Sequence, residues 1–128
     1  MELRKHINDC AAPICETSQG YSRTFRFPPS FSGFDGHFPD NPVLPGVIQV
    51  ILGELSSLEI LSKNYRSEKL ILASVTRCKF LRPIKPDEDV KLNFSIKTKP
   101  EKHISICTIT VGDEPAASYQ LIFSPEER

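Results

Sequence analysis

The sequence predicts an α+β fold in which one long helix packs against a curved antiparallel sheet. The segment from residue 46 to about residue 64 has the apolar spacing of a helix. Four later segments have the length and alternating pattern of strands, and proline- or glycine-containing turns separate them. Successive strands that follow a single helix favour an antiparallel sheet with the helix on one face.

Length and composition fit one ordinary globular domain. The chain has 128 residues, of which 39% are hydrophobic and 25% charged, and most domains contain ~100–150 residues. We therefore expect a single domain over residues 1–128, with its core at about 21–123. Residues 1–20 are polar and mixed, and they predict either a short strand around Cys10–Cys15 or a loosely ordered start.

Charge and patterning exclude several classes of protein. Sixteen basic residues balance sixteen acidic ones, whereas nucleic-acid-binding domains usually carry a basic surplus. No apolar run approaches the ~18 residues of a membrane span, and the N-terminus has no secretory apolar region. We therefore expect a cytoplasmic protein that binds neither nucleic acid nor membrane. Its four cysteines fit reduced thiols, and their spacing argues against a metal site.

The elements follow in a clear order along the chain. Residues 21–27 alternate like a half-buried strand, although Arg23 interrupts the apolar side. The helix begins after Pro45 and should end near residues 63–64, and its apolar stripe is wide enough that we expect sheet on most sides. The later strands are expected at residues 70–80, 89–98, 103–111 and 116–123.

Residues 28–46 form a long loop with five prolines and three glycines. A loop of this length inside a compact domain is often functional. Phe31, Phe34 and Phe38 interleave with the glycines and should anchor the loop on the body of the protein. The chemistry of the protein is therefore expected in or beside this segment.

The loop contains a specific pattern: Gly36-His37-Phe38-Pro39, then Pro42, then Pro45-Gly46-Val47. In this pattern the sequence resembles the FabA/FabZ family of 3-hydroxyacyl-acyl-carrier-protein dehydratases. The segment Lys79-Phe-Leu-Arg-Pro-Ile-Lys-Pro-Asp87 is similar to a second motif of that family. The resemblance covers about residues 21–123. It implies a hot-dog fold, in which the curved sheet wraps around the central helix.

The resemblance also implies a site. A dehydratase removes a proton from C2 of a 3-hydroxyacyl thioester and expels the C3 hydroxyl as water. His37 is the expected base, because imidazole titrates near neutral pH. Free N–H groups at Gly46 and Val47 can stabilise the developing oxyanion at the helix start. We expect Phe38, Gln49 and Ile51 beside the substrate as well, with Gln49 able to hydrogen-bond a ligand or water. No cofactor is implied.

One expected group is missing. The resembling enzymes carry a Glu or Asp fourteen positions after the histidine, on the helix of the partner subunit, and this chain has Ile51 there. Glu54 lies one helical turn further on and could replace the acid, or it could be an exposed helix charge or cap a polar pocket. Asp35 could orient the His37 imidazole, although it could equally be a turn former. His6 and His103 have no such context and are expected at the surface.

Partners follow from the same resemblance. Arg77 and Lys79 are two positions apart on a strand and Arg82 and Lys85 follow closely. This basic group could dock an acidic acyl carrier protein, or it could be an ordinary solvated strand face. The substrate is expected to be an acyl-carrier-protein or CoA thioester. Hot-dog domains of this type pair edge to edge, so we expect a homodimer or a higher homo-oligomer.

Three functions remain open from the sequence. The first is 3-hydroxyacyl thioester dehydration with a rearranged acid. The second is thioester hydrolysis by another type of hot-dog enzyme, in which a carboxylate such as Glu54 would activate water or attack the thioester. The third is a non-catalytic acyl-binding or carrier-protein-binding subunit, in which Ile51 marks a lost acid. A fold alone does not decide between them.

Overall fold

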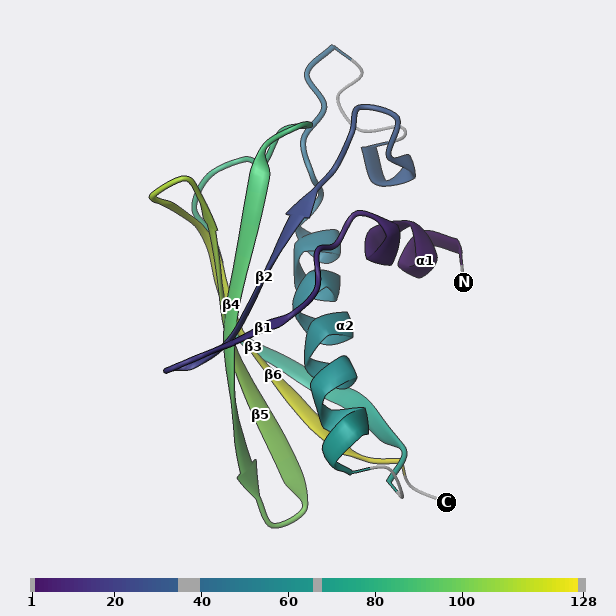
Figure 1. Cartoon of the computed structure of the whole chain (residues 1–128), viewed down its shortest axis with the longest axis vertical. Coiled ribbons are helices and arrows are strands. Elements are labelled where there is room, and N and C mark those ends of the chain that lie inside the picture. Colours follow the sequence, from purple (N-terminus) through teal and green to yellow (C-terminus); the bar gives the residue numbers. More distant parts are fainter. Residues whose placement is uncertain (1, 35–39, 66–67, 127–128) are drawn as a thin grey trace.

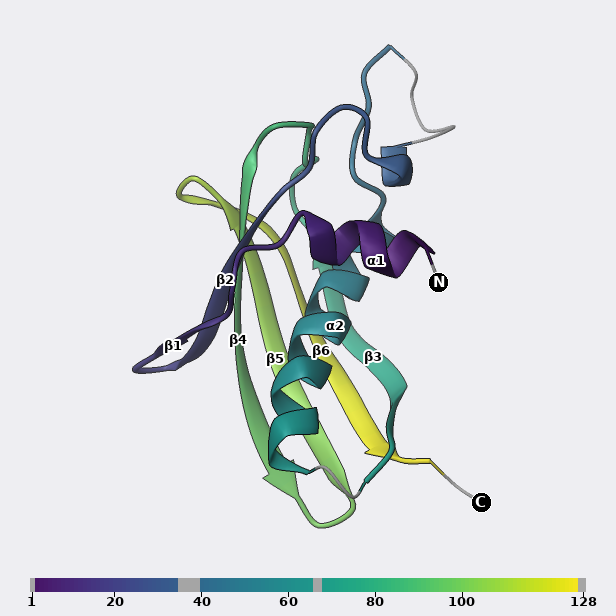
Figure 2. The same ribbon diagram turned by 45° about the vertical axis from the view of Figure 1, so that its right-hand side comes forward.

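A long helix, α2 (Gly46–Asn64), lies along the concave side of a six-stranded sheet (Figures 1 and 2). The structure is a computed structural model and describes residues 2–34, 40–65 and 68–126. Before α2 come α1 (Glu2–Asp9), β1 (Cys15–Thr17), β2 (Gly20–Arg26) and one short turn of 3₁₀ helix, η1 (Ser32–Phe34). After it come β3 (Leu70–Phe80), β4 (Asp89–Lys99), β5 (Lys102–Val111) and β6 (Glu114–Pro125).

The sheet has the order β1-β2-β4-β5-β6-β3, and each neighbouring pair is antiparallel. Strand β3 follows α2 in sequence but lies at the far edge, beside β6. Figure 2 shows the strands curving around the helix. The predicted α+β hot-dog fold is confirmed.

The strands end where the sequence contains turn residues. Glu101 links β4 to β5 with a φ of 72°, and Gly112 links β5 to β6 with a φ of 60°. Asp87 precedes β4 and has a φ of 66°. Aspartate and glycine tolerate this left-handed backbone better than most residues do. The predicted strand boundaries agree with the structure to within about two residues at each end.

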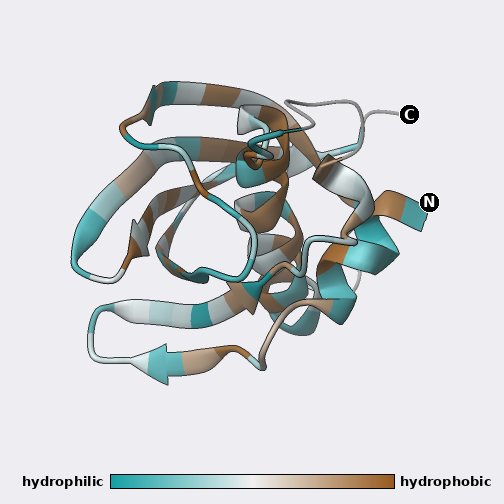
Figure 3. Cartoon of the chain, turned by 90° about the horizontal axis from the view of Figure 1, so that it is seen from above, coloured by the Kyte–Doolittle hydropathy of each residue, from teal (hydrophilic) through white to brown (hydrophobic). Residues whose placement is uncertain are grey.

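The core lies between one face of α2 and the inner face of the sheet. Buried α2 residues recur at helical spacing: Ile48, Gln49, Leu52, Gly53, Ser56, Ser57 and Leu61. The sheet meets them with a second set of buried side chains that includes Phe25, Leu92, Ile109, Tyr119 and Leu121. Figure 3 shows the apolar colouring concentrated on α2 and the strands around it. The sheet thus covers one face of α2, and the expectation of sheet on most sides was too strong.

The N-terminal segment differs from its prediction. Residues 2–9 form a helix rather than a loose start, and Figure 1 shows it beside the first half of α2. The short strand expected around Cys10–Cys15 lies slightly later, at β1 (Cys15–Thr17). Ile7 is fully buried in the helix, and Leu3 and Cys10 pack against the core on the same side. The spacing of these three residues (3, 7, 10) is that of one helix face. Because this helix is only two turns long and mostly polar, its periodic pattern is too weak to predict a helix from the sequence.

Two polar residues are buried in the sheet, one of them contrary to expectation. His103 is buried rather than at the surface: its Nδ1 lies 2.9 Å from the Thr98 hydroxyl, and its ring packs on Tyr65. Arg23, which interrupts the apolar side of β2, is buried too. Its Nε donates to the Ala12 carbonyl at 2.9 Å, and its guanidinium lies 5.5 Å from the centre of the Phe25 ring. Both side chains are buried because they have partners.

Among the described residues, no helix combines the length and the apolar character that crossing a bilayer requires.

Candidate active site

The loop that contains the sequence signature is anchored on both sides. On the N-terminal side, Phe31 and Phe34 are buried and their rings meet edge to face, with centroids 5.7 Å apart. On the C-terminal side, the buried Leu44 donates its backbone N–H to the Ile84 carbonyl at 2.8 Å. The predicted site residues Asp35, His37 and Phe38 lie between these anchors and outside the described residues.

The signature leads into the N-terminus of α2. Pro45 is the N-cap residue and has no side-chain cap; its carbonyl accepts the N–H groups of Ile48 and Gln49 at 3.1 and 3.2 Å. Gly46 and Val47 occupy the first two helical positions, where no intrahelical acceptor exists. Within the described part of the chain neither N–H has a partner. Two free donors therefore stand at the positive end of the helix dipole, which suits a developing negative charge.

A pocket of about 380 Å³ opens at this end of the helix. Its walls are mostly apolar, and they are formed by Leu44, Gly46, Gln49, Phe80, Leu81, Arg82 and Pro83. Phe80 and Leu81 are 50% and 58% exposed, and Val47 in the first turn of α2 is 68% exposed. A pocket with apolar walls and few polar groups is typical of a small-molecule site.

Gly46 makes this pocket possible. A Cβ atom at this position would lie 2.8 Å from the Phe80 ring, closer than side chains normally approach. Because glycine has no Cβ atom, the end of β3 can pack directly over the start of the helix. The glycine thus brings the backbone donors and the aromatic wall into one place.

Gln49 lies in the wall of the pocket and is 3% exposed. Its Nε2 donates to the Leu44 carbonyl at 3.2 Å. Its Oε1 is buried and has no hydrogen-bond partner, the only such side-chain atom among the described residues. Buried polar atoms are normally satisfied, so this one needs an explanation.

Tyr119 fixes the helix beside the pocket. Its hydroxyl donates to the Gln49 carbonyl at 2.5 Å and accepts from the Gly53 N–H at 3.2 Å. These two backbone groups are four residues apart, the spacing of a helical hydrogen bond. Burial raises the pKa of Tyr119 well above its ordinary value, so the hydroxyl remains a donor. The side chain thus holds α2 at the turn that includes Gln49.

Ile51, which stands where the acid is expected, and Glu54, the possible replacement, have different surroundings. Ile51 is half-buried on α2 and packs against the core. The carboxylate of Glu54 forms an ion pair with Arg4 of α1, with 3.0 Å between the charged atoms, and its side chain is 14% exposed. Glu54 is therefore neither a free acid nor an exposed helix charge in this structure.

The basic residues separate into two groups. Arg77 and Lys79 border one hollow on the sheet together with Ser118 and Gln120. A bulge between Thr76 and Lys79 interrupts the pairing of β3 with β6 there, and Arg77 has a φ of 52°. The other two, Arg82 and Lys85, lie beyond the end of β3 at the turn before β4.

Glu88 organises that turn. Its carboxylate accepts from Arg82 at 2.9 Å and from the Lys85 backbone N–H at 2.8 Å. Burial alone would raise the pKa of Glu88, but the Lys85 N–H and the Arg82 guanidinium outweigh it, so its pKa lies below the ordinary value. Arg82 is thus partly neutralised beside the pocket, whereas Arg77 and Lys79 remain exposed on the sheet.

Comparison with known proteins identifies the family. Residues 14–119 match the family model described as ApeI-like, ApeI dehydratase. The chain belongs to the ApeI-like dehydratase family. The matched region spans the sheet from just before β1 to β6 and includes α2 and its N-terminal pocket.

Sequence relatives of this ApeI-like chain include FabZ dehydratases. It is 33% identical over 93 residues to the 3-hydroxyacyl-[acyl-carrier-protein] dehydratase FabZ of Levilactobacillus brevis, and 36% identical over 93 residues to that of Clostridium acetobutylicum. Each alignment covers 70% of this chain, and 63% and 66% of the respective relatives. The chain thus spans slightly less than two thirds of the curated relatives it matches.

Solved structures share the fold of the ApeI-like chain. One is the dehydratase heterocomplex ApeI:P from Xenorhabdus doucetiae, with a TM-score of 0.65 and 19% identity over 89% of this chain and 96% of that one. Another is the PaaI protein of the E. coli phenylacetic acid degradation operon, with a TM-score of 0.69 and 12% identity over 99% of this chain and 86% of that one.

Some features of this pocket were not predicted from the sequence. The apolar walls formed by Leu44, Phe80 and Leu81 depend on how β3 ends over α2. The Tyr119 hydroxyl contacts the backbone of Gly53 and of Gln49, which lie 66 and 70 positions before it in the sequence. One sequence signal did exist, because Gly53 stands alone inside a helical pattern, and such a glycine often marks a close approach. A Cβ atom there would lie 2.7 Å from Tyr119.

Proposed function

We propose that this chain is a dehydratase of 3-hydroxyacyl thioesters, with acyl-carrier-protein thioesters as its substrates. Membership of the ApeI-like dehydratase family carries the proposal. The pocket at the start of α2 supports it, since Gly46 and Val47 direct two free N–H groups to the place where an enolate oxygen would develop. The relatives named as 3-hydroxyacyl-[acyl-carrier-protein] dehydratases indicate the substrate class.

In the proposed reaction, His37 takes the proton from C2 of the substrate. The electron pair left at C2 forms the C2–C3 double bond as the C3–O bond breaks. The departing hydroxyl needs a proton to leave as water, and the protonated imidazole of His37 can return the one it removed. The products are then an enoyl thioester and water, with His37 in its starting form.

Glu54 is the other candidate for the acid. Its carboxylate is engaged by Arg4, and an ionised carboxylate accepts hydrogen bonds rather than donating them. This favours His37 as the source of the proton. Ile51 cannot donate a proton, and it packs against the core rather than lining the pocket at the start of α2.

Turnover of a 3-hydroxyacyl carrier-protein substrate tests the proposal. Enoyl product and free thiol should be followed together for the wild type, His37→Ala and Glu54→Gln. Glu59→Gln is a matched control, because Glu59 is also on α2 and also pairs with an arginine, Arg23, at 3.4 Å. We expect enoyl product from the wild type, none above background from His37→Ala, and nearly normal rates from both glutamate variants.

Other outcomes would indicate the alternatives. Free thiol without enoyl product would support thioesterase activity. Some solved structures of the same fold are named as thioesterases. Carrier-protein binding without any turnover would support a non-catalytic subunit, which the apolar Ile51 favours. Loss of activity in Glu54→Gln but not in Glu59→Gln would make Glu54 the acid.

We also propose that the protein works as a homodimer paired through β3. This edge strand is eleven residues long and exposed along most of its length. It carries apolar side chains at Ile71, Val75 and Phe80, and an exposed apolar edge strand invites pairing with another chain. The solved heterocomplex suggests a second possibility, a partner of different sequence. Sedimentation of the purified protein should give twice the mass of the chain, and Val75→Lys should lower it.

The proposed docking surface for the carrier protein consists of Arg77 and Lys79. Both side chains are exposed on one hollow of the sheet, and an acidic partner would be attracted to them. Reversing both charges to glutamate should weaken carrier-protein binding strongly at low salt and little at high salt.

Because the four cysteines are free thiols, we place the protein in the reducing cytoplasm.

A further inference from the structure

The buried amide of Gln49 has an acceptor atom that nothing in the described structure satisfies. Leaving a buried acceptor without a donor costs free energy. Such an atom is expected where a ligand supplies the missing donor. Gln49 lines the pocket at the start of α2 and is almost completely buried.

The orientation of this amide is fixed by its surroundings. Nε2 donates to the Leu44 carbonyl, and exchanging the two ends of the amide would place Oε1 against another oxygen. The main chain of Gln49 is held as well, because its carbonyl accepts from Tyr119. The backbone carbonyl and Nε2 of Gln49 are thus both engaged. The remaining polar atom of the side chain, Oε1, can only accept a hydrogen bond.

Both kinds of polar group therefore belong to residues in the first turn of α2. Gly46 and Gln49 are three residues apart, a spacing that places them on the same helix face. The N–H groups of Gly46 and Val47 suit an acceptor on the ligand, and Gln49 Oε1 suits a donor. The remaining walls, including Phe80 and Leu81, are largely apolar. This combination fits a thioester carbonyl followed by a short apolar chain that bears a hydroxyl group.

We infer that Gln49 Oε1 accepts a hydrogen bond from the C3 hydroxyl of the acyl chain and makes the pocket selective for 3-hydroxyacyl thioesters. The inference rests on the proposed function and adds a specificity-determining residue to it. A saturated chain or a 3-oxo chain has no donor at C3 and would leave Oε1 unsatisfied. Sites built around a hydrogen bond discriminate strongly against ligands that lack it.

Calorimetric binding of stable analogues tests the inference. Amides replace the thioester in 3-hydroxyhexanoyl-, 3-oxohexanoyl- and hexanoyl-aminopantetheine, so that C2 is less acidic and the hydroxylated ligand is not dehydrated. The wild type should bind the 3-hydroxy ligand about tenfold more tightly than the saturated one, the effect of one hydrogen bond of about 1.4 kcal/mol. The 3-oxo ligand should gain nothing over the saturated one.

The variant Gln49→Met keeps the length of the side chain and removes its polar atoms. This variant should bind the 3-hydroxy and saturated ligands with about equal affinity. Its affinity for the saturated ligand should differ from that of the wild type by less than about threefold. Gln120→Met is the matched control, since Gln120 lies on the sheet beside Arg77 and Lys79 and not in this pocket. It should keep the tenfold preference.

Three results would overturn the inference. Equal affinities for the hydroxylated and saturated ligands in the wild type would show that Oε1 does not read the hydroxyl, even if Gln49→Met fails to fold. An equal loss for both ligands in a folded Gln49→Met would make Gln49 a structural brace for Leu44. Absence of binding by all three ligands would overturn the proposed function together with the inference.

Discussion

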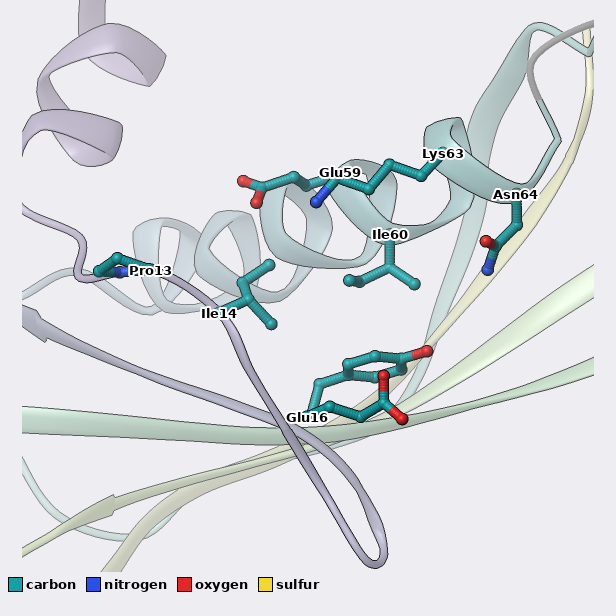
Figure 4. Close-up of a pocket in the computed structure, with 8 residues that line it drawn as sticks. Pro13, Ile14, Glu16, Glu59, Ile60, Lys63 and Asn64 are labelled. Atoms are coloured by element: carbon teal, nitrogen blue, oxygen red, sulfur yellow. The ribbon is translucent and has the colours of Figure 1, made fainter.

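The two ends of α2 each border a hollow of similar size, but the two hollows differ in chemistry. The one at the N-terminal end has a volume of about 380 Å³ and the one at the C-terminal end about 350 Å³. Figure 4 shows the second, where Glu59, Ile60 and Lys63 of α2 face the segment before β1 and Glu16 on that strand. Its lining is completed by Pro13, Ile14, Tyr21 and Asn64.

The difference shows that volume alone does not identify a site. At the C-terminal end the polar groups are long charged side chains, and Glu59 already pairs with Arg23. At the N-terminal end, two backbone donors and the Gln49 acceptor have no partners within the described residues. Unsatisfied groups that are held in place, beside apolar walls, distinguish a binding pocket from a hollow between elements.

The largest expected effect concerns the middle of the helix, between the two hollows. In Gly53→Val the new Cβ would lie 2.7 Å from the Tyr119 ring and 3.0 Å from the Cys107 sulfur. Both neighbours are buried, so the core must shift, and the free energy of unfolding should fall by about 3 kcal/mol. Urea denaturation measures this. A loss below about 1 kcal/mol would show that Tyr119 does not pack on α2 as described.

Gly46→Val should affect binding more than stability. Its Cβ would meet the ring of Phe80, which is half-exposed and can move outward. The unfolding free energy should change by less than about 1 kcal/mol. The affinity for hexanoyl-aminopantetheine should fall at least about tenfold, because the added side chain fills the pocket. Lys63→Ala, at the other end of α2, is the control and should leave the affinity unchanged; the reverse pattern would place the ligand in the C-terminal hollow.

Tyr119→Phe should destabilise the protein less than Gly53→Val does. The hydroxyl satisfies the Gln49 carbonyl and the Gly53 N–H, and its loss removes two buried hydrogen bonds. Because these backbone groups are four residues apart, a direct helical bond between them can limit the loss. We expect about 1 kcal/mol of destabilisation in urea denaturation. An unchanged midpoint would mean that the direct bond replaces the bridge completely.

The smallest effect depends on pH. The pKa of Glu88 is lower in the folded protein than the ordinary value of 4.5. Its contribution to stability is therefore fully present above pH 4.5 and is lost as the pH falls through the lower, folded-state pKa. At neutral pH the free energy of unfolding of the wild type should exceed that of Glu88→Gln by less than about 1 kcal/mol. This difference should disappear in acid. A gap that widened in acid would contradict the pairing with Arg82.

The sequence predicts much of this fold because its signals are local. Period-two strands, the single apolar helix and turn residues such as Gly112 can each be read within a few positions. The site is less predictable, because its groups meet only in three dimensions. Glu54 and Arg4 are 50 positions apart, and no local pattern shows that they pair. The unsatisfied oxygen of Gln49 depends on Leu44 taking only one end of the amide.

The central claim is that the start of α2, and not its end, binds the acyl thioester. The most direct measurement is a titration of ¹⁵N-labelled protein with hexanoyl-aminopantetheine, followed by amide chemical shifts. The largest changes should fall on the N–H groups of Gly46 and Val47, with Glu59 to Asn64 unaffected. Changes centred on residues 59–64, or no changes at Gly46 and Val47 at saturating ligand, would contradict the claim.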